Sequence, residues 1–406
     1  MSEPGTAQPG TEPWRRAEAS RLISFGRAAA LPDGGFGWLD VDGGIDPAQP
    51  RPLYINARMT YVFALAHLAD VAGADALAAS GLDAITDRYA DGANGGWFSS
   101  LDPAGNVLDT TKANYAHAHV LLAAASALAA GIPGAGPVLE AAGAVIGRHF
   151  WSDAEGLARE SWNAGFTESE PYRGANSNMH SVEAYLAAGD VTGDPVWHAR
   201  AASIAGYLVN VQARAHAWRI PEHYDENWQP LPDYNADRPN DPFRPPGTTP
   251  GHSFEWARLL VTLEAAQPAP AAWLLEAATA LFDTAVADAW QRDGHPGLIY
   301  TVDAGGQPVV AARMHWVACE AVLAADALHR RTGQDRFAAA AARWWDEIDR
   351  YFLDRQHGGW WQELAPDMTP ATFTWSGKPD LYHSYQALLL PSLPLSPTAA
   401  TALARP

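Results

Sequence analysis

Stretches rich in alanine and leucine, with apolar residues at helical spacing, alternate along the chain with short segments rich in glycine, tryptophan and aspartate. These short segments recur about every 64 residues between Trp38 and Trp360. An interval of that length holds two ordinary helices with their connections. The six segments cover residues 34–38, 95–105, 150–162, 218–228, 297–306 and 358–361.

Six helical hairpins of this length predict an all-α fold of the (α/α)6 barrel type, with an inner and an outer ring of helices. An open helical solenoid is the alternative, but its repeats are usually shorter. Several short segments, such as residues 97–107, have the turn residues of β-hairpins, which we expect in the loops at one end of the barrel. The proline-rich run 239–250 predicts a long loop over the barrel mouth.

Composition favours one globular domain preceded by a short tail. Residues 1–15 are rich in glycine, proline, serine, threonine and glutamate, which predicts a disordered N-terminal tail rather than a signal peptide. No shift in composition divides the rest, so residues 16–398 are expected to form a single (α/α)6-barrel catalytic domain. The single cysteine, Cys319, permits no intramolecular disulfide, and no apolar stretch is long enough to span a membrane. A cytoplasmic protein is expected.

The net charge of −19 argues against several classes of partner. A surface this acidic repels nucleic-acid backbones and anionic lipids, so neither nucleic acid nor membrane is an expected partner. We expect a monomer or a homodimer.

Three histidines share a position that suits acid–base chemistry. His180, His252 and His383 each lie near the expected start of an inner helix, and Glu183 and Glu255 follow the first two at i+3. The positive end of a helix disfavours the imidazolium form, so such a histidine stays neutral and can act as a base. The carboxylate at i+3 is expected to orient the ring. A single histidine at a helix start is more often structural, but three of them favour function.

Other polar residues share the faces of expected inner helices. Arg58 is expected to open a helix over residues 58–68 and to lie on its buried stripe, where it needs either an ion-pair partner or a polar cavity. Tyr115 and His119 share one helical face, whereas His117 points elsewhere. We interpret His119 as a core histidine whose hydrogen bonds are satisfied.

No motif indicates a metal or a cofactor. The pattern His-x-x-Glu occurs twice, but two-metal helical bundles use the reverse order, and the chain contains neither His-Glu-x-x-His nor a cysteine pair. Glycine-rich nucleotide-binding loops are also missing from the sequence. We therefore expect neither metal nor cofactor.

Several motifs, in order and spacing, resemble the N-acylglucosamine 2-epimerase superfamily. Arg58-Met59 and Tyr115 also fall in the expected order, and the resemblance extends over residues 38–391. Within the superfamily, the chain looks closest to the branch of mannose isomerases and sulfoquinovose isomerases. The motifs are Asn176-x-Asn178-Met179-His180-x-x-Glu183, Pro250-Gly251-His252-x-Phe254-Glu255-Trp256 and Lys378-Pro379-Asp380-x-Tyr382-His383.

The resemblance implies an (α/α)6 barrel that moves a proton at C2 of a free sugar without cofactor or metal. It implies that His252 and His383 are the acid–base pair. A family stretch that usually begins with two tryptophans reads His315-Trp316 here, so this wall of the cavity departs from the pattern. The residues matching substrate-binding or supporting positions are Arg58, Tyr115, Asn176, His180, Glu255 and Trp316.

The expected substrate is a monosaccharide. The expected activity is aldose–ketose isomerisation of D-mannose, with D-lyxose as a further aldose, to D-fructose or D-xylulose through a cis-enediol. His383 would remove the C2 proton, His252 would assist ring opening, and Arg58 would stabilise the enediolate, although the two histidines could exchange roles. A sulfoquinovose isomerase, with Arg58 and Gln362 near the sulfonate, or a sugar 2-epimerase is the alternative. More remote are an (α/α)6 glycoside hydrolase, which needs two carboxylates across a cleft, and a non-catalytic sugar-binding protein.

Overall fold

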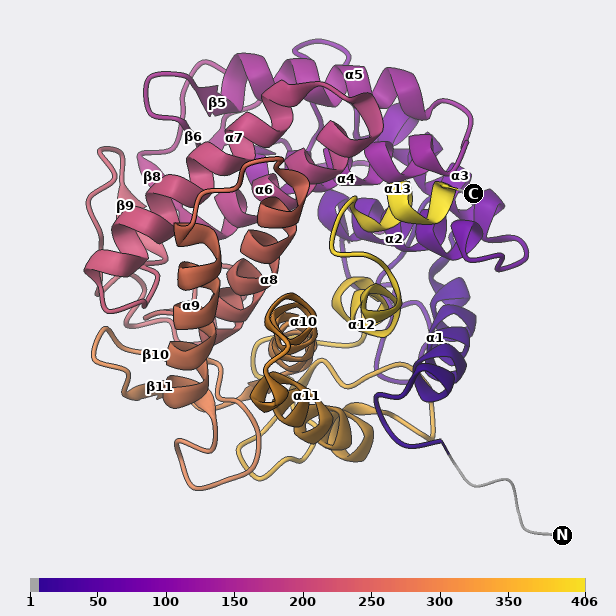
Figure 1. The fold of residues 1–406 in the computed structure, drawn as a ribbon. Coiled ribbons are helices and arrows are strands. Elements are labelled where there is room, and N and C mark those ends of the chain that lie inside the picture. The colour runs from indigo at the N-terminus through magenta and orange to yellow at the C-terminus, as the bar shows by residue number, and fades with distance from the viewer. Residues whose placement is uncertain (1–6, 406) are drawn as a thin grey trace, which may run out of the picture.

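A computed structural model describes residues 7–405 as two concentric rings of helices (Figure 1). The inner ring consists of α2 (Leu53–Leu68), α4 (Asn114–Ala129), α6 (Ala175–Thr192), α8 (Pro250–Ala266), α10 (His315–Thr332) and α12 (Tyr382–Leu389). The outer ring consists of α1 (Glu12–Gly26), α3 (Ala74–Ala84), α5 (Ala135–Val145), α7 (Pro195–Ala205), α9 (Trp273–Ala289) and α11 (Asp335–Glu347). The predicted (α/α)6 barrel is confirmed.

The two ends of the chain close the ring. Neighbouring inner helices pack together in chain order, and α12 packs against α2. Five outer helices pack against the inner helix that precedes them, whereas α1 packs against α12. The sixth hairpin therefore pairs helices from opposite ends of the chain. A final helix, α13 (Ala399–Ala404), packs against α2, α4 and α6 (Figure 1).

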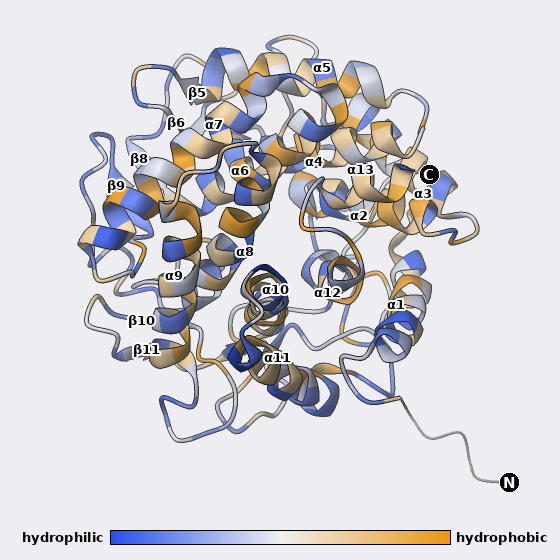
Figure 2. Ribbon diagram, in the orientation of Figure 1, coloured by the Kyte–Doolittle hydropathy of each residue, from blue (hydrophilic) through white to orange (hydrophobic). Residues whose placement is uncertain are grey.

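Inner helices are buried on almost every side. In α2, each residue from Leu53 to Ala66 is buried. An inner helix has a neighbour on each side, an outer helix behind it and the barrel interior in front, so no solvated face remains. Arg58 is buried, as expected, but the expectation that it opens its helix is wrong, because α2 begins five residues earlier. The helix also has no exposed stripe. Outer helices such as α11 carry most of the hydrophilic surface (Figure 2).

Short antiparallel strands gather at one end of the barrel. Strands β1, β4, β8 and β12 each lead directly into an inner helix, namely α2, α4, α6 and α10. This end is therefore the mouth, where the N-termini of the inner helices converge. The paired strands are β1 (Arg51–Pro52) with β2 (Ser100–Leu101), β2 with β3 (Val107–Asp109), β4 (Lys112–Ala113) with β7 (Ser161–Trp162), β5 (Trp151–Ser152) with β6 (Leu157–Ala158), β8 (Tyr172–Gly174) with β9 (His223–Asp225), β10 (Thr301–Val302) with β11 (Pro308–Val310), and β12 (Arg313–Met314) with β13 (Glu363–Leu364).

The proline-rich segment 239–250 lies over the mouth, as predicted. Its Phe243 ring packs edge-on against Tyr54 and Tyr115, with ring centroids 5.3 and 5.6 Å away. The ring of Trp375, from the loop before α12, lies 5.6 Å from Phe243. These aromatic contacts hold the loop against the barrel and narrow the entrance.

At the N-terminus, helix α1 begins at Glu12, inside the range 1–15 that composition predicts as a tail. Residues 1–6 lie outside the described part of the chain, and the boundary at residue 16 stays a prediction. Within residues 7–405, no helix combines the length and the apolar character that crossing a membrane requires.

Candidate active site

One cavity at the barrel mouth brings together all eight residues that the sequence singles out. Residues from every inner helix contribute to its wall, because each helix points its first turns at the mouth. The side chains that line this mouth cavity are Tyr54, Arg58, Tyr115, Asn176, His180, Pro242, Phe243, Pro245, His252, Glu255, Tyr300, His315, Trp316, Gln362, Trp375, Pro379, Asp380 and His383.

Two of the cavity histidines are backed by carboxylates. The Nδ1 atom of His252 lies 2.9 Å from Glu222 Oε1, and that of His383 lies 2.9 Å from Glu320 Oε1. A carboxylate accepts the Nδ1 hydrogen, which fixes the ring and leaves Nε2 to exchange protons. Both rings pack on Trp316, with ring centroids 5.1 and 5.7 Å away. The two imidazoles thus share one wall of the cavity.

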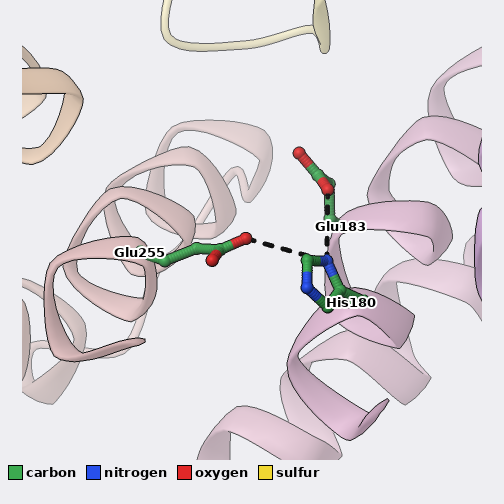
Figure 3. A group of neighbouring side chains, drawn as sticks. All are labelled: His180, Glu183 and Glu255. Atoms are coloured by element: carbon green, nitrogen blue, oxygen red, sulfur yellow. Dashed lines mark ion pairs between the residues drawn. The ribbon is translucent and has the colours of Figure 1, made fainter. Parts of the chain in front are cut away.

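The carboxylate partner of His252 is not the one expected from helical spacing. Glu255 does not contact His252 but lies 3.7 Å from Nδ1 of His180 (Figure 3). Glu222, which orients His252, precedes β9 and lies thirty residues before the histidine in the sequence. Because the partner comes from another element, the i+3 argument could not find it. Glu183 does lie beside His180, at 3.8 Å, as the i+3 spacing predicts (Figure 3).

A buried charge cluster forms the floor of the cavity. The guanidinium of Arg258 lies 3.5 Å from Glu183, 3.6 Å from Glu255 and 3.0 Å from Glu320. His180, Glu183 and Glu255 place potential metal-ligand atoms within 4.8 Å of one another, and so do Glu255, Glu320 and His383. Arg258 supplies one cation to this cluster from within the protein itself.

Glu183 and Glu255 have different protonation states within this cluster. Burial by itself raises the pKa of Glu183, but the contacts with His180 and Arg258 outweigh this effect and lower the pKa to about 2. Glu183 is therefore ionised. Burial and the charge of Glu320 raise the pKa of Glu255 well above its usual range. Neither carboxylate oxygen of Glu255 has a hydrogen-bond partner in the protein. Glu255 therefore faces the cavity as a neutral acid that can donate a hydrogen bond.

Arg58 is held by three groups at once. Its guanidinium pairs with Asp380 at 3.2 Å and donates hydrogen bonds to Tyr115 and to Nε2 of His119. Because Nε2 of His119 accepts from Arg58, its Nδ1 carries the hydrogen that bonds to the Tyr115 carbonyl, 2.8 Å away. His119 is thus the satisfied core histidine that the sequence predicts. The same contacts point the guanidinium into the cavity.

The protonation state of His383 suits a base. Burial and the nearby charge of Arg58 lower the pKa of His383 well below its usual range. The imidazole is therefore neutral at pH 7 and can accept a proton. Burial likewise lowers the pKa of His180 to about 4.

Four residues at or beside the cavity were not singled out individually from the sequence. Glu222 and Glu320 act through histidines 30 and 63 residues away. Phe243 and Trp375 lie in loops whose positions depend on the packing over the mouth. Only the spatial neighbourhood identifies these four residues.

His117 points away from the cavity, as its spacing predicts. Its Nε2 accepts a hydrogen bond from the Trp97 amide and its Nδ1 lies 2.7 Å from the Ala113 carbonyl. The residue is fully buried, and burial lowers its pKa to about 3.

A His117→Gln variant should therefore lose less stability than the wild type when the pH falls. In the wild type, the unfolded chain takes up a proton at His117 near pH 6.5 and the folded chain does not, so stability falls as the pH drops below 6.5. Between pH 7 and 5 this removes about 2 kcal/mol, which the variant does not lose. Urea unfolding of both proteins at the two pH values measures the difference, and equal pH slopes would contradict it.

The fold and this cavity place the protein among the (α/α)6-barrel enzymes. The chain belongs to the N-acylglucosamine 2-epimerase family, which it matches over residues 34–387. Its similarity to D-mannose isomerase from Thermobifida fusca is 51% identity over 400 residues, 98% of each chain. D-mannose isomerase from Pseudomonas cannabina pv. alisalensis is 46% identical over 401 residues, 98% of this chain and 96% of the relative.

Solved structures give the same family at the level of the fold. A crystal structure of D-mannose isomerase superposes with a TM-score of 0.88 at 29% identity, over 94% of this chain and 98% of that one. Cellobiose 2-epimerase from Spirochaeta thermophila superposes with a TM-score of 0.80 at 20% identity, over 96% of each chain. The second likeness extends the shared fold to an enzyme with a different reaction.

Proposed function

We propose that this protein is a D-mannose isomerase that converts D-mannose to D-fructose by moving a proton from C2 to C1. Two carboxylate-backed imidazoles on one cavity wall carry the proposal, because each half of the reaction needs a group that takes and returns a proton. The identity of 51% to a D-mannose isomerase over nearly the whole chain supports the choice of sugar.

In the proposed mechanism, His252 first assists opening of the sugar ring. His383 then takes the C2 proton. The electron pair of the broken C2–H bond forms the C1–C2 double bond of a cis-enediolate. Arg58, whose charge already acts on His383, stabilises the negative oxygen. His252 carries the hydroxyl proton from O2 to O1, and His383 returns its proton to C1. Each imidazole thus returns to the protonation state in which it began.

The remaining predicted residues would hold the sugar. Tyr115 and Trp316 offer aromatic faces, and Asn176 offers a side-chain oxygen that has no partner in the protein. Glu255 and His180 form the floor beneath them. Apart from histidines, Arg58 is the basic residue among the described cavity-lining residues, and Asp380, Tyr115 and His119 already engage it. A neutral hexose therefore fits better than a sulfonated or phosphorylated sugar.

The acidic residues that line the cavity do not have the arrangement that a glycoside hydrolase needs. Glu255 and Asp380 are the acidic residues among the described cavity-lining residues, and Asp380 is paired with Arg58. Glycoside hydrolysis uses one free carboxylic acid and one free carboxylate on opposite sides of the scissile bond. This arrangement supports proton transfer by histidine instead.

Incubation of the protein with D-mannose in D2O tests the proposal. We expect D-fructose as the product, with deuterium at C1 in the fraction of turnovers in which the proton on His383 exchanges with solvent. NMR identifies both the sugar and the labelled carbon. D-glucose as the main product would instead indicate a 2-epimerase, and no conversion with no exchange at C2 would overturn the proposed function. D-lyxose, run in parallel, shows whether a five-carbon sugar is also accepted.

A further inference from the structure

The partner of Nδ1 distinguishes His315 from the two proposed acid–base histidines. In His252 and His383 the Nδ1 atom faces a carboxylate, which stabilises the ring when it takes a proton. In His119 and His315 it faces a backbone carbonyl instead, and for His315 this is Gln362 O at 3.2 Å. A carbonyl oxygen can only accept, so Nδ1 of His315 carries the ring hydrogen. Burial lowers the pKa of His315 to about 4, so the ring holds no second proton at neutral pH.

The Nε2 atom of His315 is consequently a bare acceptor. His315 lines the mouth cavity, is 4% exposed, and has no hydrogen-bond partner at Nε2 among residues 7–405. In His119, the corresponding atom accepts from Arg58. A buried acceptor left without a donor is costly, so this atom is suited to a donor brought by the ligand. A sugar hydroxyl is such a donor.

The neighbours of His315 indicate which part of the sugar it meets. Its ring centroid lies 6.4 Å from that of His383, and Asp380 and Arg58 are the charged groups that act on it. In the proposed mechanism C1 and C2 lie within reach of both His252 and His383. Among the described residues, His315 shares a ring contact with His383 but none with His252, so we assign it to a hydroxyl on the carbons beyond the reacting pair.

We propose that His315 is a specificity-determining residue whose Nε2 accepts a hydrogen bond from the sugar hydroxyl on C3, C4 or C6. The inference rests on the proposed function for the identity of the sugar. It assigns His315 no proton transfer, which separates it from His252 and His383.

Substrate analogues combined with two variants test this assignment. His315→Phe keeps an aromatic ring beside His383 but removes the acceptor, whereas His315→Gln places an amide oxygen near the position of Nε2. With D-mannose, we expect His315→Phe to lower kcat/KM about tenfold, mainly through KM, and His315→Gln to recover part of the loss. One of the three deoxy-mannoses, modified at C3, C4 or C6, lacks the bonded hydroxyl. With that analogue, the wild type and His315→Phe should have nearly equal kcat/KM.

Three results would overturn the proposal. An equal loss on every analogue would give His315 a structural role, and no loss on D-mannose would remove it from the site. A shifted pH profile of kcat/KM in His315→Phe would make it a proton-transfer group. Thermal melting checks that each variant folds. If His315→Phe does not fold, the analogue series is compared between the wild type and His315→Gln instead. If the wild type converts no D-mannose, the proposed function fails first, and the same comparison is made on whichever aldose it converts.

Discussion

His383→Asn is expected to lower kcat for D-mannose isomerisation by roughly 10³-fold or more, with little change in KM. A positioned general base contributes about 10² to 10⁴ to the rate. Among the described cavity residues, His252 is the other imidazole with a carboxylate oxygen 2.9 Å from its Nδ1. Asparagine keeps a polar group near Glu320 without a basic nitrogen. Steady-state kinetics measure the loss, and exchange of the C2 proton in D2O should fall in parallel.

His252→Asn is the matched variant that separates the two roles. If His252 serves ring opening, that step becomes slow in its absence, and [2-²H]-D-mannose should react with a suppressed isotope effect on kcat/KM. Residual turnover in His383→Asn should keep the full isotope effect, since C2–H cleavage remains limiting. The opposite pattern would exchange the two assignments, and wild-type rates in both variants would sink the proposed mechanism.

Arg258→Met is expected to reduce the free energy of unfolding by about 3–5 kcal/mol, because it leaves buried carboxylates without their cation. Arg258 is the arginine that reaches Glu183, Glu255 and Glu320, and all four side chains are buried. Methionine fills a similar volume, so the loss reports charge rather than a cavity. Urea unfolding at pH 7 measures the change.

The pH dependence of the stability of Arg258→Met provides a second, independent test. Without Arg258, the pKa values of these carboxyl groups are higher in the folded chain than in the unfolded chain. Ionising them therefore lowers the free energy of unfolding, and this loss grows as the pH rises. The difference in stability between Arg258→Met and the wild type should therefore narrow from pH 7 to pH 5. Arg258→Lys keeps the charge and should lose less. A loss that is independent of pH would show that packing, not charge, makes Arg258 important.

The spacing of the glycine- and tryptophan-rich segments was sufficient to predict the barrel. That period reflects the length of a helical hairpin, which local sequence largely dictates. It could not reveal that α1 and α12 form the sixth pair, because ring closure joins residues that are far apart in the chain. Nor could helical stripes place Arg58, since an inner helix has no exposed face from which to read a stripe.

The sequence by itself determined the period of the barrel, the histidines near the inner-helix starts, and the motifs that identify the family. Only the tertiary structure decided which carboxylate serves which histidine: Glu222 rather than Glu255 orients His252, and Glu320 orients His383. It also decided that Nε2 of His315 faces the cavity unpartnered. The physical reason is that helical periodicity fixes neighbours at i+3 and i+4, whereas the contacts that set protonation here cross between helices and depend on how the ring closes.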